Sequence, residues 1–457
     1  MDALALEQLQ LENQLLRERV AQLEQTIREL EKRLEATERS AKRQAAPFSK
    51  GKPKDKPKKP GRKSGDEHGD HGHRPPPTPD QIDETLDAAL PAECPHCGGD
   101  VVEDRVDQQF QTEIPRQPIV REITIHCGHC QNCGKHLRGR HPLQTSQATG
   151  AAQSQLGADA QAAVVYLNKH AGMSHGKIAD AFGKVFGISL SRGACAQIVL
   201  RAGKKLQPVY EQIKERIIDS EHLTPDETGW RIGGHSAWLH AWVGDDGATL
   251  FAIDPQRSAD VLENVIGIDW SGSMTHDGFS SYERFDNVAH QQCVDHALRR
   301  ARSLVDKHTG TAKAFPQQVI DLFTESLQRR DEFDEAKVDQ DRRGEAFEDY
   351  VQRLNDLTKR PRVNEENARF AKHLSKHVSG WFLFLVDPTI PATNHRAEQA
   401  LKTPIVNRKV WGGNRTDNGG EAQAVVGSVL QTCKNKAVDA FTFFSNAFHG
   451  VLGNLFA

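Results

Sequence analysis

Three acidic residues stand in three separate motifs of the chain. Asp226 begins DETGW, Asp277 begins DGFSSYERF, and Glu398 lies within NHRAEQAL. Two neighbouring carboxylates repel each other unless a divalent cation lies between them. Magnesium prefers such oxygen ligands and keeps water and phosphate oxygens in its remaining positions. If the fold brings them together, these acids predict a magnesium site for chemistry at phosphorus.

Each acid, taken alone, also has an ordinary structural explanation. Asp226 could be a turn acid, and Asp277 could start a turn before Gly278. Glu398 could pair with Lys402, one helical turn further on. The catalytic hypothesis therefore depends on the three acids acting together.

Five of the eight cysteines lie between Cys94 and Cys133 and predict a second metal site. Two C-x-x-C pairs can place four thiolates around a structural zinc ion. The predicted ligands are Cys94, Cys97, Cys130 and Cys133. Cys127 and Cys130 form a competing pair, but the glycine after Cys133 suits a tight turn. Residues 108–115 and 119–126 alternate like paired strands, so we expect a zinc ribbon.

Short strands and a helix are expected to position the acids. Strand-like runs occupy residues 222–232, 235–244 and 248–254, and the turns between them suit consecutive hairpins. A helix is expected at 258–267, followed by a strand that ends at Asp277. This order is typical of the opening of a ribonuclease-H-like fold, in which acids on the first and fourth strands lie side by side.

Two helical regions flank the strands. Residues 155–218 are expected to be helical, and 175–202 resembles a helix-turn-helix in which Ser191 caps the second helix. An ordinary helical hairpin would give the same pattern. Further along, Asn394 can cap a helix that carries Glu398.

The N-terminal residues show a heptad pattern that predicts a parallel two-stranded coiled coil. Leucines occupy the d positions at Leu9, Leu16, Leu23 and Leu30, and the a positions are Asn13, Val20, Ile27 and Leu34. A single amphipathic helix packed on its own chain is the alternative. The following stretch from Lys42 to Lys63 has ten basic residues and one acid, which predicts an extended linker, either a plain spacer or an arm that contacts DNA phosphates.

Composition excludes several classes of protein. The longest apolar run has six residues, Trp381–Val386, whereas a membrane-spanning helix needs about 20. The first residues lack the pattern of a secretory signal. The sparse, clustered cysteines indicate metal binding in a reducing compartment rather than a disulfide scaffold. We therefore expect a cytoplasmic, nucleoid-associated protein without a membrane partner.

These motifs, together with Cys293–His296 followed by Arg299 and with NRKVWGG, resemble in order and spacing the DDE transposases of the insertion sequence sixty-six family. The resemblance covers nearly the whole chain. It differs at one point, because His395 stands where the family usually has a second asparagine. The resemblance implies that Asp226, Asp277 and Glu398 hold two magnesium or manganese ions.

The resemblance also implies roles for residues around the acids. The residues expected near the site are His296, Asn394 and Arg396. By their spacing, Lys402, Arg408 and Lys409 are expected to contact DNA phosphates, with a solvated basic face as the alternative. The implied reaction is cleavage at the element's ends followed by joining of the ends to target DNA. Implied partners are both DNAs, a second copy of the chain through the coiled coil, and accessory proteins of the same element.

Two other functions are compatible with the sequence. One is a non-enzymatic DNA-binding regulator derived from a transposase, and the other is a metal-dependent nuclease without strand transfer.

The expected fold class is multidomain α+β. The expected parts are a coiled coil (1–41), a basic linker (42–85), the zinc ribbon (86–145), a helical DNA-binding region (150–218), a ribonuclease-H-like core (219–300 and 376–457) and a helical insertion (301–375).

Overall fold

The computed structural model describes residues 155–456 without a break. It also describes residues 76–148, except 88, 94, 101, 103, 104, 107 and 112–117, and the five positions 16, 20, 23, 24 and 27. Most of the predicted coiled coil, the linker up to residue 75, and Cys94 therefore lie outside the described residues. Within the described part of the chain, no helix combines the length and the apolar character needed to cross a bilayer.

Contacts divide the chain into two compact units. The smaller unit comprises residues 45–119 and 185–187. It includes the short 3-10 helix η2 (Pro79–Gln81) and an antiparallel bridge between Glu93 and Asp100. The larger unit comprises residues 1–44, 120–184 and 188–457, and it includes the mixed α+β part of the chain.

The hairpin of β1 (Cys127–His129) and β2 (His136–Arg138) encloses the second cysteine pair. Gly134 has φ +69° and donates its N–H to the carbonyl of Cys130 at 2.8 Å, so the turn expected after Cys133 is present. The strand predicted at 119–126 is wrong, because these residues are not in a strand. Ile119 and Val120 are exposed, and Ile123 and Ile125 are half-buried, so alternation alone does not stabilise pairing there.

Three helices follow within the larger unit. They are α2 (Ala158–Lys169), α3 (His175–Val185) and α4 (Arg192–Ile218). The Ser191 hydroxyl accepts a hydrogen bond from Ala194 N at 3.1 Å, which confirms the predicted N-cap of α4.

A five-stranded sheet forms the centre of the larger unit. Its strands are β3 (His222–Ile232), β4 (His235–Gly244), β5 (Thr249–Asp254), β6 (Gly272–His276) and β7 (Val288–Gln292), in the order β5-β4-β3-β6-β7. The first three strands pair antiparallel, and β6 and β7 run parallel to β3. Helix α5 (Ala259–Ile266) connects β5 to β6. The mixed α+β class and the expected strand positions are confirmed.

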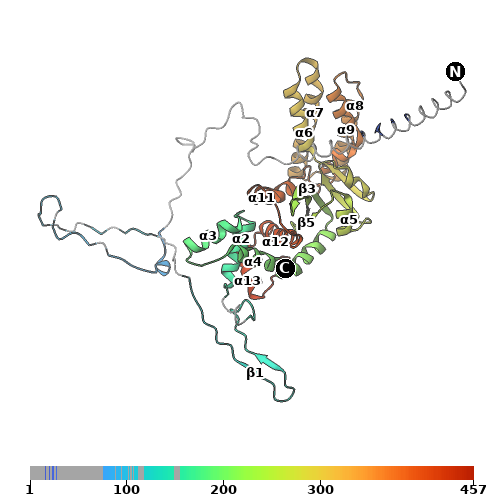
Figure 1. The fold of residues 1–457 in the computed structure, drawn as a ribbon. Helices are drawn as coiled ribbons and strands as arrows, with labels where there is room; N and C mark the ends of the chain where they lie inside the picture. Colours follow the sequence, from blue (N-terminus) through green and yellow to red (C-terminus); the bar gives the residue numbers. More distant parts are fainter. Residues whose placement is uncertain are drawn as a thin grey trace, which may run out of the picture. The chain divides into compact units, whose positions relative to one another are not determined.

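One face of the sheet packs against α11 (His395–Trp411) and α12 (Asp417–Asn435), which Figure 1 shows beside β3 and β5. Apolar side chains of β3, β4 and β5 form a buried cluster with Ala397, Ala400 and Leu401 of α11 and Ala424 of α12. Helix α13 (Ala440–His449) packs on α2.

Both ends of α11 are attached to the sheet region. Before the helix, the carbonyl of Pro391 accepts a hydrogen bond from the Thr275 hydroxyl of β6 at 2.8 Å. After the helix, Asn414 N donates to the carbonyl of Arg231 at 2.9 Å, and Asn414 Oδ1 accepts from Trp230 Nε1 at 2.8 Å. The VWGGN segment therefore continues along the end of β3.

Helices between β7 and α11 form a second apolar core. They are α6 (Val294–Lys307), α7 (Ala314–Ala336), α8 (Gln340–Lys359), α9 (Glu365–Lys376) and α10 (Leu383–Val386), with 3-10 turns η5 (Gly310–Lys313) and η6 (Ser379–Trp381). Figure 1 shows α6 to α9 as a group of helices beside the sheet. Helix α6 runs across residue 300, where the insertion was expected to begin.

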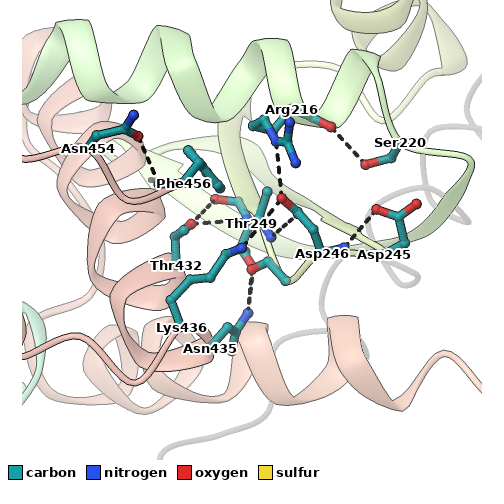
Figure 2. A network of polar contacts seen from close by, with 12 residues as sticks. Arg216, Ser220, Asp245, Asp246, Thr249, Thr432, Asn435, Lys436, Asn454 and Phe456 are labelled. Atoms are coloured by element: carbon teal, nitrogen blue, oxygen red, sulfur yellow. Dashed lines mark hydrogen bonds and ion pairs between the residues drawn. The ribbon is translucent and has the colours of Figure 1, made fainter.

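Polar contacts fix the turn between β4 and β5 (Figure 2). Asp246 in this turn forms an ion pair with Arg216 of α4 at 3.1 Å. Thr432 Oγ1 of α12 accepts from Thr249 N at 3.0 Å, and Asn435 Nδ2 donates to the Gly247 carbonyl at 2.9 Å. These bonds join the outer hairpin to the helices that cover it.

Candidate active site

Asp226 lies within β3, and Asp277 directly follows the end of the neighbouring parallel strand β6. The ladder between β3 and β6 pairs His222 with Ser273, residues 51 positions apart, and Asp226 and Asp277 have the same separation. Residues in register on parallel strands point to the same face. Asp226 also pairs with Ala241, whose side chain packs in the cluster with α11, so Asp226 lies on the side of β3 that faces the helix carrying Glu398.

Asp226 lies in a crowded acidic environment. Burial, the largest cause, and the charges of Glu227, Asp277 and Glu398 together raise its pKa to about 8. One hydrogen bond, from Glu227 N to Asp226 Oδ1 at 2.8 Å, opposes this rise. The charges of both other predicted acids thus act on Asp226.

Asp277 follows the last residue of β6 and is fixed by a local turn. Its Oδ1 accepts a hydrogen bond from Phe279 N at 3.0 Å. The preceding side chain makes a matching bond, because His276 Nδ1 accepts from Gly278 N at 3.2 Å. Two successive side chains therefore each hold a backbone N–H two residues ahead.

Glu398 lies in the first turn of α11 and is held by residues of α6. Arg299 Nη2 donates to Glu398 Oε1 at 2.7 Å, and His296 Nε2 lies 3.7 Å from the same oxygen. His296 was expected near the site, whereas the role of Arg299 as the partner of Glu398 was not predicted. Arg299 also pairs with Asp295 at 2.9 Å.

Asn394 precedes α11 but does not cap it with its side chain. The helix lacks a side-chain capping bond at this position, so that part of the prediction is wrong. Asn394 is 1% exposed, and its side-chain Nδ2 and Oδ1 have no hydrogen-bond partner. Its backbone N instead donates to Cys293 Sγ at 3.4 Å.

The predicted basic residues of α11 differ in position. Lys402 and Lys409 are exposed, and Arg396 is exposed with Nη1 3.5 Å from the Asp245 carbonyl. Arg408 is half-buried and donates to Thr228 Oγ1 at 3.4 Å, two residues beyond Asp226 on the same strand. Of these residues, Arg408 is the one bonded to the strand that carries an acid.

Trp411 packs inside the protein. Its ring lies edge-on to Trp230 with centroids 6.0 Å apart, and Lys169 Nζ lies 5.3 Å from the Trp411 ring centre.

A buried ion pair behind Asp226 was missed from the sequence. The Glu227 side chain is 2% exposed and pairs with Arg257, whose Nε donates to Oε1 at 2.7 Å. The Tyr282 hydroxyl donates to Glu227 Oε2 at 2.8 Å. The Arg257 guanidinium lies 4.2 Å from the Phe279 ring centre, so this network links β3 to the segment after Asp277. The one hint in the sequence was the second acid of DETGW, Glu227, which directly follows Asp226.

The acidic group fits a divalent cation in its chemistry. Carboxylate oxygens are the ligands that magnesium prefers, and burial together with the charges of neighbouring acids raises the pKa of Asp226. Within the described residues, however, no three His, Cys, Asp or Glu side chains are gathered closely enough to hold a metal ion. The bond from Arg299 to Glu398 would have to be exchanged for a cation.

The predicted zinc ligands are described only in part. Cys94 lies outside the described residues, and Cys97 belongs to the smaller unit, so the four-thiolate set stays a prediction. Cys130 has its pKa lowered by backbone N–H groups of Cys133 and Asn132, which favours a thiolate there. This local geometry suits the Cys130/Cys133 pair.

Comparisons with known proteins give the chain its family. The model described as "Transposase IS66 family" matches residues 153–422, a range that includes all three acids. Uncharacterized protein y4hP of Sinorhizobium fredii (strain NBRC 101917 / NGR234) is 24% identical over 403 residues, 79% of this chain and 71% of the relative. Uncharacterized protein y4qI of the same strain is 24% identical over 291 residues, and the match spans 53% of its length. The family match covers more than half of the chain, which therefore belongs to the IS66 family of transposases.

Proposed function

We propose that this chain cleaves DNA at the ends of an insertion element and joins those ends to target DNA. Membership of a transposase family implies DNA as the partner. The observation that carries the proposal is that Asp277 and Glu398, distant in sequence from Asp226, both raise the pKa of its carboxyl group.

In this proposal, Asp226, Asp277 and Glu398 hold one or two magnesium or manganese ions. Bound there, the ions would activate a water or a DNA hydroxyl and stabilise the leaving oxygen at phosphorus. Arg408, beside Thr228, would orient a backbone phosphate near the acids, and the exposed Lys402 and Lys409 would contact neighbouring phosphates.

We also propose a role for each remaining part. The strand order β5-β4-β3-β6-β7 supports a ribonuclease-H-like core with α7 to α9 as an insertion. The zinc ribbon and the α3–α4 pair would recognise the element's ends, and accessory proteins of the same element would be further partners. The coiled coil would hold two copies together, so that two ends can be paired.

One observation favours a second function, a DNA-binding regulator without catalysis. Glu398 is engaged by Arg299 at 2.7 Å, and an acid that stays in this ion pair could not complete a metal site. A nuclease that cleaves without joining is the third outcome that the experiment distinguishes.

The test uses the purified full chain with DNA that carries matched element ends, with and without magnesium. We expect cleavage and joining by the wild type, and a loss of about 1,000-fold or more in Asp226→Asn, Asp277→Asn and Glu398→Gln, since the metal supplies most of the charge stabilisation. Glu348→Gln, a change to an exposed acid on α8, is the matched control. Binding without cleavage would favour the regulator, and cleavage without joining would favour the nuclease.

A further inference from the structure

A continuous chain of hydrogen bonds joins the two ends of the segment that follows Asp277. This segment, residues 278–285, contains the 3-10 helix η4 (Ser280–Arg284). Gly278 N donates to His276 Nδ1 at 3.2 Å, His276 Nε2 lies 3.1 Å from His290 Nδ1, and His290 Nε2 lies 3.1 Å from the Phe285 carbonyl oxygen. His276 ends β6 and His290 lies on β7, so the chain crosses between neighbouring strands.

The atoms at the two ends of this chain determine the tautomers of both histidines. A backbone N–H can only donate, so His276 Nδ1 must be without a proton and its Nε2 must carry one. His290 Nδ1 must then accept from His276, which leaves the proton of His290 on Nε2. A carbonyl oxygen can only accept, and the Phe285 carbonyl faces this Nε2–H. Every donor therefore meets an acceptor with both rings neutral.

The surroundings of the pair favour neutral rings. His276 is fully buried, and the His290 ring lies edge-on to it with centroids 5.2 Å apart, so water does not solvate a charge on this ring. His290 is half-buried, and burial lowers its pKa against the opposing charges of Glu283 and Asp286. The Tyr282 ring also packs on His276, with centroids 5.3 Å apart.

We propose that His290 is a positioning residue for Asp277, because it keeps His276 in the tautomer that accepts the Gly278 N–H. This inference rests on the proposed function, in which Asp277 is a metal ligand. If His290 no longer offers an acceptor, His276 can move its proton to Nδ1, where it would oppose the Gly278 N–H. The turn in which Phe279 N holds Asp277 Oδ1 would then loosen.

Groups that orient metal ligands in this way commonly change metal affinity by about 10- to 100-fold when they are replaced. Three substitutions of His290 separate orientation from simple packing. His290→Asn keeps an acceptor near the Nδ1 position, His290→Gln keeps a donor near the Nε2 position but loses that acceptor, and His290→Phe loses both. A role in packing alone would not rank the asparagine variant above the glutamine variant.

The experiment measures Mn²⁺ binding to the full chain without DNA, by the electron paramagnetic resonance signal of free Mn²⁺. We expect His290→Gln and His290→Phe to raise the Kd about 10-fold, and His290→Asn to stay within about 3-fold of the wild type. The matched control is His240→Phe, because His240 is a buried histidine of the same sheet that bonds to the Gln256 carbonyl, outside this chain. Circular dichroism melts check that each variant is folded.

Three outcomes of this experiment test the positioning role of His290 and the proposed metal site. The expected ranking supports the positioning role. Equal Kd values for the asparagine and glutamine variants, with wild-type binding that Asp226→Asn removes, would overturn the role of His290 and leave the proposed function intact. Wild-type Mn²⁺ binding that does not depend on Asp226 would overturn the metal site and the positioning role together.

Discussion

At the level of single residues, the buried carboxylate of Asp226 lowers the stability of the folded protein when it is charged. Its pKa of about 8 means that, without a cation, the folded protein holds a proton on this carboxyl group near neutral pH. A cation bound there would displace that proton, so metal binding should tighten as the pH rises. Functional sites commonly carry such a cost.

This environment predicts a pH-dependent effect of Asp226→Asn on stability. The unfolded chain loses the Asp226 proton near pH 3.8, whereas the native state keeps it to about pH 8. The unfolded state then binds fewer protons, so the wild type loses free energy of unfolding as the pH rises from about 4 to 8. In thermal melts without added magnesium, we expect the variant to melt higher than the wild type at pH 8, by on the order of a few degrees, and equally at pH 4. A difference in melting temperature between the two proteins that stays the same from pH 4 to pH 8 would contradict this prediction.

Arg299 competes with a cation for Glu398, which gives a second prediction at this scale. The two side chains are 51% and 32% exposed, so their ion pair contributes at most about 1 kcal/mol. We expect Arg299→Gln to tighten Mn²⁺ binding by about 2- to 5-fold, the equivalent of that energy, in the same binding assay. Weaker binding would mean that Arg299 instead orients Glu398 for the metal.

The residue types of the acids could be predicted from their motifs, but their partners could not. Asp226, Asp277 and Glu398 stand out because their three motifs together resemble those of a transposase family. Arg299 contacts Glu398 across 99 positions of sequence, and Tyr282 contacts Glu227 across 55. Such contacts follow from the packing of α6 and α11 and of the loop after β6, which no local pattern encodes.

At the level of elements, prediction succeeded where a buried face enforced the pattern. The strands of the sheet are largely buried; in β4 the last six residues are all buried. Apolar side chains of β3, β4 and β5 pack on α11 and α12, and a slip of one residue would turn every side chain to the wrong face. The segment 119–126 alternates in sequence, but Val120 is 90% exposed, and this segment is not in a strand.

The glycines after α11 provide a prediction for an element. Gly413 has φ +123°, and a Cβ there would lie 2.5 Å from the Arg231 carbonyl oxygen, whereas a Cβ on Gly412 would meet nothing within 4 Å. Gly412→Ala should cost about 1 kcal/mol for its left-handed conformation alone. Gly413→Ala should cost about 2 kcal/mol or more, because it also displaces the chain from β3. Urea unfolding measures the free energy of unfolding of both variants. Equal losses in the two variants would show that the close approach to Arg231 does not add to the cost at Gly413.

At the level of the whole molecule, the N-terminal heptads predict a dimer. Leu16, Val20, Leu23 and Ile27 are helical, and their side chains are 53–59% exposed. These are a and d positions, which a second copy would cover. We expect light scattering to give twice the 50.8 kDa chain mass for the full protein and the monomer mass after deletion of residues 1–41. An unchanged dimer would place the interface elsewhere.

Zinc provides a second test at this scale. If Cys94, Cys97, Cys130 and Cys133 share one ion, the purified chain should release about one equivalent of zinc when its thiols are modified. Cys130→Ser should release none, whereas Cys127→Ser should match the wild type. Loss of zinc in both variants would favour the competing pair.

The attachment of α11 at both ends limits how the protein can rearrange during a reaction. Pro391 is bonded to β6 on one side and Asn414 to β3 on the other, so the helix cannot swing as a lid. Glu398 can still exchange Arg299 for another partner by rotating its own side chain, a movement that takes picoseconds to nanoseconds at exposed positions. The slow events of the cycle would then be the arrival, pairing and release of DNA, rather than assembly of the acids.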